Sequence, residues 1–257
     1  GVLTGEQNVV VGRNAGQDMT SATKNVFLGF EAGLNATTSD GNVIIGHEAN
    51  GAGILTGNNN VVIGKLAGND MTSANQNVLI GEDAGANITE ADANVIIGQG
   101  AGEAVTTGGS NILVGVNAGN SFDAETHNLA IGLSALSGSV NGGEYNVAIG
   151  NLSLDALTSG DNNTFVGYNS GSALTTGSDN IAIGSNAMYQ GAVTGQYNIA
   201  LGSSALRNLT DGPSNVAIGI NSLEALTTGD RNIAIGMSSS TGYDAENDNL
   251  AIGHSAL

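Results

Sequence analysis

Residue types that carry catalytic chemistry are few in this sequence, and they are scattered. The three histidines, His47, His127 and His254, lie far apart in the chain, and there is no cysteine. Serine is abundant, but a hydrolytic triad needs a serine, a histidine and an acid that converge on one point. No motif in the sequence brings such a set together. We therefore predict that the protein is not an enzyme, with no catalytic residue and no cofactor.

Two acidic pairs are the candidates for metal ligands. Asp123 and Glu125, and likewise Asp244 and Glu246, flank an alanine at the same position of an internal repeat, and an asparagine follows closely in both cases. Oxygen ligands in a turn suit Ca²⁺. However, the paired glycines and fixed aspartate of calcium-binding nonapeptide repeats are absent. The sequence favours solvated turn charge and no bound metal here, with these four carboxylates as the candidate calcium ligands.

The composition excludes several classes of partner. The 257 residues include 41 glycines, one proline and no tryptophan, and the formal net charge is −18. A surface this acidic repels phosphate, so nucleic acid and anionic membranes are not expected as partners. No apolar run approaches the length of a membrane span, so membrane insertion of this segment is not expected. The high glycine content points instead to a repeat protein.

The elements that position these residues come from a short internal repeat. Each copy consists of Asn, three mostly apolar residues and Gly, and successive copies are 17 or 18 residues apart. The repeat asparagines are Asn8, Asn25, Asn42, Asn60, Asn77, Asn94, Asn111, Asn128, Asn146, Asn163, Asn180, Asn198, Asn215, Asn232 and Asn249. A motif kept in register this often indicates a single β-solenoid repeat domain over residues 1–257. Because neither end carries an atypical capping coil, we expect the chain to be a fragment of a longer fibre.

Each apolar triplet is predicted to be a short β-strand, because its residues are β-branched and turn formers flank it. Seventeen residues are too few for a helical hairpin, and no segment has a 3.6-residue period. We therefore predict an all-β β-solenoid of about 15 coils of 17–18 residues, each with two short strands and two turns. A strand spacing of about 4.8 Å per coil gives a rod on the order of 70 Å long. The first and third triplet residues are expected to face the core of the coil, and the middle residue to point away.

The repeat asparagines and glycines have structural explanations. Stacked asparagine side chains are expected to form a hydrogen-bonded ladder that holds the turn. The glycine four positions later permits a positive φ or a close approach of the backbone at the corner of the coil. Neither residue needs a functional role under this interpretation.

Two positions of the repeat exchange their sizes along the chain. In the first seven repeats the middle triplet residue is bulky and the residue six positions later is usually glycine, as in Phe27 with Gly33. From the eighth repeat the sizes usually reverse, as in Ala217 with Leu223. Side chains that trade volume usually share a packed space. An outward apolar column of this length would also be too large a patch to leave in contact with water.

We therefore predict that the bulky members of both columns lie between chains, in a homotrimer around a common axis. The alternative is that both columns lie inside one coil. The predicted interface residues are Val10, Phe27, Ile44, Val62, Leu79, Ile96, Leu113, Leu136, Leu154, Phe165, Met188, Leu206, Leu223 and Leu257.

The motif Asn-Val-Ala-Ile-Gly at residues 146–150 and 215–219, with related copies at 180–184 and 232–236, resembles the head repeats of trimeric autotransporter adhesins. It is also similar to repeats of phage tail fibres, and the resemblance extends over the whole chain. It implies a left-handed parallel β-roll with three chains side by side, outside the cell on a cell or virion surface.

The expected function is that of a structural and adhesive fibre segment that presents a binding surface to a receptor or glycan of a host or target cell. One alternative is the receptor-binding shaft of a phage tail fibre. Another is a monomeric β-solenoid that acts on polysaccharides or binds ice.

Overall fold

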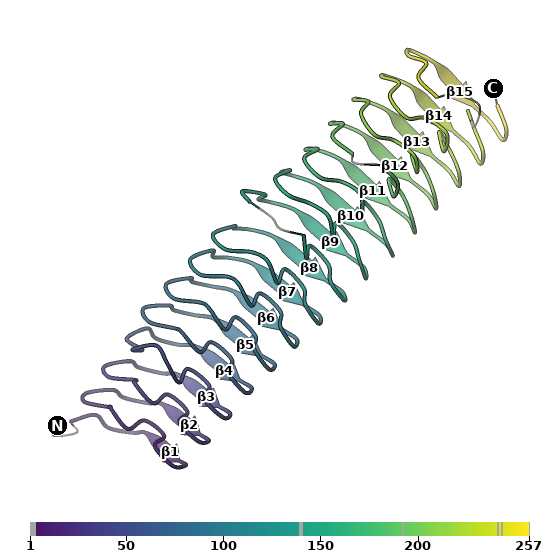
Figure 1. Ribbon diagram of the computed structural model, residues 1–257. Helices are drawn as coiled ribbons and strands as arrows, with labels where there is room; N and C mark the ends of the chain where they lie inside the picture. The colour runs from purple at the N-terminus through teal and green to yellow at the C-terminus, as the bar shows by residue number, and fades with distance from the viewer. Residues whose placement is uncertain (1–3, 139–140, 192, 241, 243, 257) are drawn as a thin grey trace. The chain divides into compact units, whose positions relative to one another are not determined.

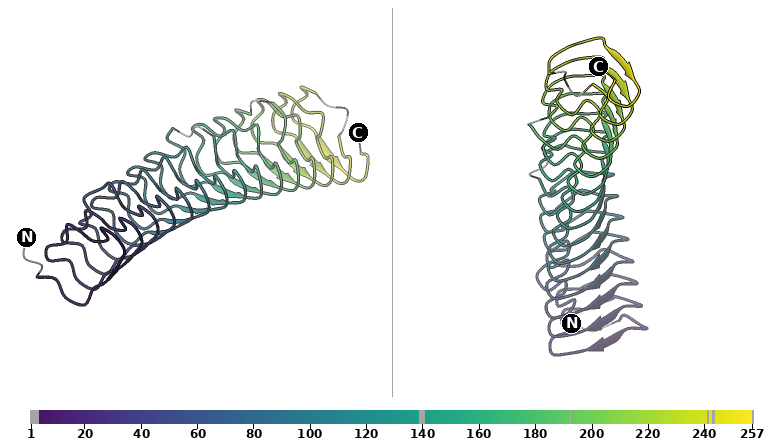
Figure 2. Two further views of the ribbon diagram at one scale, coloured as in Figure 1. Left: turned by 60° about the horizontal axis from the view of Figure 1, so that its bottom comes forward. Right: turned by 90° about the vertical axis from the view of Figure 1, so that its right-hand side faces the viewer.

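The computed structural model describes residues 4–138, 141–191, 193–240, 242 and 244–256 of the chain. Within these residues the regular secondary structure consists of short β-strands, with no helix. Contacts divide the chain into two compact units, Gly1–Asn128 and Leu129–Leu257. Each unit is a stack of coils in which every coil contributes one strand, as Figure 2 shows. The predicted all-β solenoid is thereby confirmed, with one strand for each repeat.

The strands coincide with the apolar triplets of the repeat (Figure 1). In the first unit they are β1 (Val9–Val11), β2 (Val26–Leu28), β3 (Val43–Ile45), β4 (Val61–Ile63), β5 (Val78–Ile80), β6 (Val95–Ile97) and β7 (Ile112–Val114). In the second unit they are β8 (Leu129–Ile131), β9 (Val147–Ile149), β10 (Thr164–Val166), β11 (Ile181–Ile183), β12 (Ile199–Leu201), β13 (Val216–Ile218), β14 (Ile233–Ile235) and β15 (Leu250–Ile252).

Neighbouring strands within each unit are parallel and lie in sequence order. Equivalent positions of the repeat lie side by side: Val43 pairs with Val61 in the first unit, and Ile233 pairs with Leu250 in the second. Each column of the repeat in the sequence is therefore a column of stacked side chains in space.

Each coil holds one strand rather than the predicted two. The second apolar anchor is buried as expected, with Met71 as an example, but the backbone around it forms turns. The backbone N–H and the hydroxyl of Thr72 both donate to the carbonyl oxygen of Thr89 in the next coil, at 3.0 and 2.9 Å. Shortly before the anchor, Gly68 has a φ of +52°. A left-handed residue at this point interrupts an extended backbone, which is why no second strand forms.

The middle residue of each strand points into the coil, which is opposite to the orientation expected from the sequence. In β6, Ile96 is fully buried, whereas Val95 and Ile97 are partly exposed. The preceding Asn94 is fully buried as well. Because side chains alternate along a strand, the residue two positions after a buried asparagine faces the same side. The repeat asparagine thus determines which face of the strand is inside.

The residues predicted to lie between chains therefore lie inside single coils, and that prediction is wrong. The fully buried members are Phe27, Ile44, Val62, Leu79, Ile96, Leu113, Leu136, Leu154, Phe165, Met188, Leu206 and Leu223. Val10 is 39% exposed in β1, which pairs with β2 alone in the described structure. Leu257 lies outside the described residues. A side chain that its own coil encloses cannot contact another chain.

The exchange of side-chain volume takes place within the coil, as the alternative interpretation holds. A Cβ atom on Gly102 would lie 2.8 Å from Cδ1 of Ile96 and 2.9 Å from Cδ1 of Leu113. In the second unit, Ala217 and Leu223 are both fully buried. The shared packed space that the sequence indicates exists, but one chain supplies both sides of it.

The repeat glycines meet both of the demands expected at a corner of the coil. Gly98 has a φ of +137°, and a Cβ atom there would lie 2.3 Å from the carbonyl oxygen of Gly115 in the next coil. A side chain would therefore meet both an unfavourable backbone conformation and a backbone atom that cannot move aside.

Candidate functional site

Buried asparagines run through each unit as a hydrogen-bonded ladder. The backbone N–H of Asn94 donates to Oδ1 of Asn77 at 2.9 Å, and Nδ2 of Asn94 donates to the carbonyl oxygen of Gly108 at 2.9 Å. The backbone bond recurs from Asn8 to Asn128 in the first unit and from Asn146 to Asn249 in the second. The ladder holds successive coils in register, and its side-chain amides form their hydrogen bonds within the fold.

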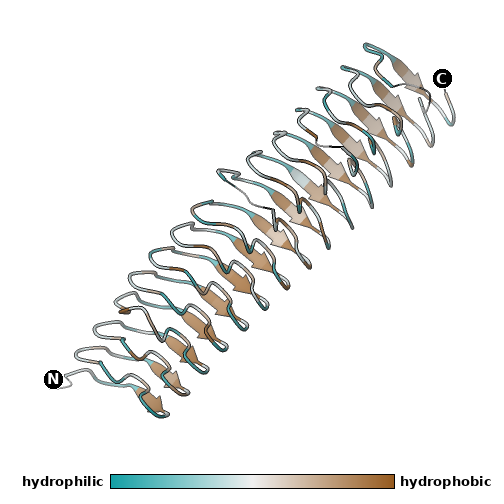
Figure 3. Ribbon diagram, in the orientation of Figure 1, coloured by the Kyte–Doolittle hydropathy of each residue, from teal (hydrophilic) through white to brown (hydrophobic). Residues whose placement is uncertain are grey.

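An apolar surface covers the outer side of the sheet in each unit. We define the outer face as the first and third residues of the strands. These residues are Val, Ile or Leu except for Thr164, and none of them is buried. Figure 3 shows the strands as hydrophobic segments between more polar turns. Monomeric soluble proteins rarely leave contiguous apolar patches of more than a few hundred Å² in contact with water, so the outer face is the candidate interaction surface.

The candidate calcium ligands close their own turns. Oε2 of Glu246 accepts hydrogen bonds from the backbone N–H groups of Asp244 and Ala245 at 2.7 and 3.1 Å. The bond from Asp244 is the main reason why the pKa of Glu246 is lowered. Oε2 of Glu125 accepts the equivalent bond from the N–H of Asp123 at 2.7 Å. The described residues contain no group of three His, Cys, Asp or Glu side chains that could hold a metal ion.

The three histidines lie in different coils and do not come together. His47 stacks on the ring of Phe30 with 4.9 Å between ring centroids, and the guanidinium of Arg13 lies 4.8 Å from the Phe30 centroid. Nδ1 of His127 and Nδ1 of His254 lie next to the hydroxyl group of the residue adjacent to each in the chain. The contacts of His47 form a short stack at the surface of the first unit, and those of His127 and His254 are local contacts with a chain neighbour.

A second polar ladder, which sequence analysis missed, runs two positions before the repeat asparagine. Here the backbone N–H of one coil donates to a side-chain oxygen of the next coil. Asp40 donates to Oδ1 of Asn58 at 2.7 Å in the first unit, and Asp161 donates to Oγ of Ser178 at 3.0 Å in the second. The signal in the sequence is the recurrence of Asp, Asn or Ser at this position, residue types whose short side chains bond to the backbone.

A helix long and apolar enough to cross a membrane is not found in the described part of the chain. Comparison of the chain with protein-family models, with curated proteins and with solved structures found no match. The surfaces of the chain itself are therefore the basis on which a function is proposed.

Proposed function

We propose that this chain is a non-enzymatic segment of a trimeric surface fibre. Three copies pack their outer faces around a common axis, and each is a left-handed roll. The exposed turns then form an adhesive surface for a receptor or glycan of a host or target cell. The fibre stands outside the cell, on a cell or virion surface, and the shaft of a phage tail fibre is one form that it takes.

The observation that carries the proposal is the apolar outer face. Ile183, for example, is 45% exposed in the isolated chain. Covering apolar surface contributes roughly 25 cal/mol per Å², so a column of such side chains gives a strong drive for association. No residue of the outer face is charged, although the chain as a whole is strongly acidic.

The periodicity of the outer face favours further copies of the same chain as the partner. Equivalent aliphatic residues recur once per coil, at the strand spacing of about 4.8 Å. A partner that complements every coil needs the same period, and a second copy in the same register has it. A globular partner would cover only a few coils and leave the rest exposed.

Two columns on each chain suit a threefold arrangement. The column of first residues can pack against one neighbour and the column of third residues against the other. A closed symmetric oligomer of this kind covers every outer face and leaves none free for further growth.

Light scattering on the purified chain tests the proposal. We expect a mass of about 76 kDa, three times 25.4 kDa. A mass of 25.4 kDa at micromolar concentration would contradict the trimer, and a dimer mass would contradict the threefold axis.

Charged substitutions on the outer face sharpen this test. A variant with Ile181→Glu, Ile183→Glu, Ile233→Glu and Ile235→Glu is expected to be monomeric with an unchanged β-type circular dichroism spectrum, because unpaired carboxylates are costly to bury. A matched control with Ile54→Glu, Leu133→Glu, Ile220→Glu and Met237→Glu adds the same number of charges at exposed apolar residues outside the outer face, and we expect it to remain a trimer.

A further inference from the structure

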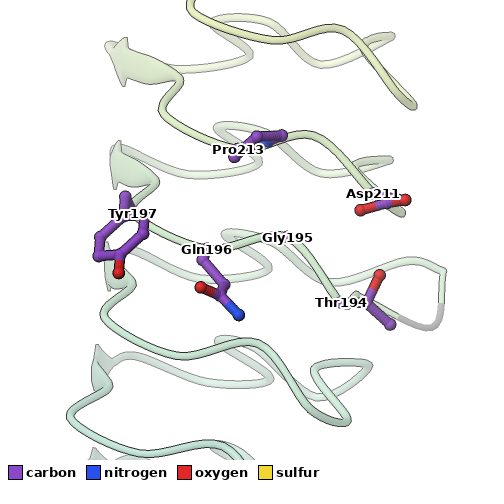
Figure 4. A pocket seen from close by; sticks show the side chains of 6 residues that line it. All are labelled: Thr194, Gly195, Gln196, Tyr197, Asp211 and Pro213. Atoms are coloured by element: carbon purple, nitrogen blue, oxygen red, sulfur yellow. The ribbon is translucent and has the colours of Figure 1, made fainter.

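A hollow of about 260 Å³ opens on the surface of the second unit, between the chain segments that lead into β12 and β13. It is lined by Thr194, Gly195, Gln196, Tyr197, Asp211 and Pro213. In Figure 4 the ring of Tyr197 lies at one end, Asp211 and Thr194 lie at the other, and Gln196 lies between them beneath Pro213. All of these residues belong to the described part of one chain.

Pro213, the single proline of the chain, explains why a hollow occurs here. It occupies the position of the second polar ladder, where a side-chain oxygen would accept a hydrogen bond from a backbone N–H of the preceding coil. Proline offers none, so in the described structure the backbone N–H of Gln196 has no hydrogen-bond partner. The ladder bond is present again in the coil that follows, where Asp230 donates to Oδ1 of Asn247 at 2.7 Å. The interruption leaves space and an unused donor at one point of the coil surface.

The groups around the hollow combine an aromatic face with both kinds of hydrogen-bonding partner. Tyr197 is 59% exposed. The side-chain amide of Gln196 donates and accepts, the carboxylate of Asp211 accepts, and the hydroxyl of Thr194 does both. None of these side chains has a hydrogen bond elsewhere in the described structure. They are therefore free to bind a polar ligand.

This combination selects the chemistry of the ligand. A sugar ring presents hydroxyl groups around its edge and C–H groups on its faces, which suit polar side chains and an aromatic ring respectively. Asp211 and the net charge of −18 oppose an anionic ligand. The volume lies below the range of about 300–1,000 Å³ for sites that enclose drug-sized molecules, and thus suits a single ring.

We propose that this hollow binds one neutral sugar ring, stacked on Tyr197 and hydrogen-bonded to Gln196 and Asp211. One chain supplies the whole site, so it does not depend on trimer formation. A failure of the sugar site and a failure of the trimer are therefore separate results.

Saturation-transfer NMR on the full chain tests the proposal with glucose, galactose, mannose and N-acetylglucosamine as probes. We expect saturable binding of at least one of them, with a dissociation constant on the order of 1 mM. The open-chain polyol sorbitol and the anionic N-acetylneuraminic acid are expected to bind at least about tenfold more weakly, a loss of 1.4 kcal/mol or more. No saturable binding of any neutral ring, or equal binding of sorbitol, would overturn the proposal.

Two variants and a control locate the binding. Tyr197→Ala removes the aromatic face and is expected to weaken binding about tenfold or more. Tyr145→Ala, at the same repeat position in another coil, is the matched control and is expected to bind like the unmodified chain. Equal effects of the two tyrosine changes would contradict the assignment.

Pro213→Asn provides a test with a second readout. Asparagine restores an acceptor for the N–H of Gln196 and occupies the hollow, so we expect binding to be lost while the thermal unfolding temperature stays the same or rises. Sugar binding that survives Pro213→Asn would overturn the proposal, whatever the behaviour of the tyrosine variants.

Discussion

In the first unit the strand supplies the bulk of the coil interior, whereas in the second unit the turn supplies it. Leu79 fills its coil in the first unit, and a Cβ atom on Gly85 would lie 3.0 Å from its Cδ2. In the second unit the strand residue is Ala200, and six positions later Leu206 is fully buried. The change of pattern begins at the strand that opens the second unit. The comparison shows that the interior of a coil must be filled, and that a large side chain from either the strand or the turn can fill it.

The two solutions differ in their backbone cost. The turn position has a positive φ in both units, +56° at Gly85 and +50° at Leu206. Glycine adopts this conformation freely, whereas a residue with a Cβ loses roughly 1 kcal/mol or more. Burying a leucine side chain contributes about 1.5–3 kcal/mol, which offsets the strain. The second unit therefore carries more local backbone strain, and packing holds that strain in place.

The largest effect is expected where one coil of the second unit keeps the pattern of the first. Phe165 in β10 is fully buried, and a Cβ atom on Gly171 would lie 2.3 Å from its Cδ1. Phe165→Ala alone is expected to lower the free energy of unfolding by about 3–5 kcal/mol through the cavity it leaves. Gly171→Leu alone is expected to cost about 1–3 kcal/mol or more through overpacking.

The double variant with both changes adopts the usual pattern of the second unit. We expect it to be more stable than the Phe165→Ala variant, because the new leucine fills the cavity. Urea unfolding of the four proteins gives the coupling energy. Strictly additive losses would show that the two positions do not share a space, and the comparison between the units would fail.

The asparagine ladder should respond equally in the two units, because it is common to both. Asn94→Ala leaves the N–H of Asn111 without its acceptor, and Asn215→Ala does the same to Asn232. We expect each change to cost about 2–3 kcal/mol, since an unsatisfied buried polar group costs about 1–3 kcal/mol. Measuring both in one denaturant series sharpens the comparison. A large difference between the two variants would mean that the strain of the second unit extends to the ladder.

The smallest expected effect is on the way the stability of each unit depends on pH. Hydrogen bonds from Thr23 hold the pKa of Asp40 in the first unit below its usual value, while burial raises the pKa of Asp155 in the second unit. The stability that Asp40 contributes is present above the usual pKa and is lost as the pH falls through the lowered value. Charged Asp155 destabilises the fold at neutral pH, and this penalty disappears as the pH falls through the raised value.

Two isosteric variants separate these contributions. Asp155→Asn is expected to be more stable than the unmodified chain at pH 7, by less than about 1 kcal/mol because the group is partly solvated, and to lose that advantage below pH ~4. Asp40→Asn keeps an oxygen acceptor without titrating, so its stability relative to the unmodified chain should rise in strong acid. If the free energies of unfolding of the two variants changed with pH in the same way, relative to the unmodified chain, this assignment would be contradicted.

Much of the fold follows from the periodicity of the sequence. The repeat predicts each strand, the stacking of coils, the ladder of asparagines and the need for glycine at the corner. These features depend on one residue type at one position, and the sequence repeats that information in every coil. The second polar ladder is less evident in the sequence, because Asp, Asn and Ser share the position and other residue types, such as Gly109 and Pro213, replace them in several coils.

The sequence pattern predicts the interaction surface on the wrong face of the strand. Three apolar residues in a row satisfy either orientation, so hydrophobicity alone does not choose between them. The bulk of the first and third residues suggests that they form the core. The buried asparagine decides otherwise, because its amide bonds to carbonyl groups inside the coil, as in the bond from Asn94 to Gly108. The polar residue beside a short strand therefore determines which of its two faces is buried.

The ladder bonds within a unit join residues 17 or 18 positions apart, and they have the same form in every coil. A gene that duplicates one whole repeat would therefore add a coil whose bonds already exist in its neighbours. Each such event lengthens the unit by about 4.8 Å, so length can change in inherited steps without any new folding information. A duplication of part of a repeat, by contrast, would place the next asparagine out of line with its neighbours and leave its ladder bonds unmade.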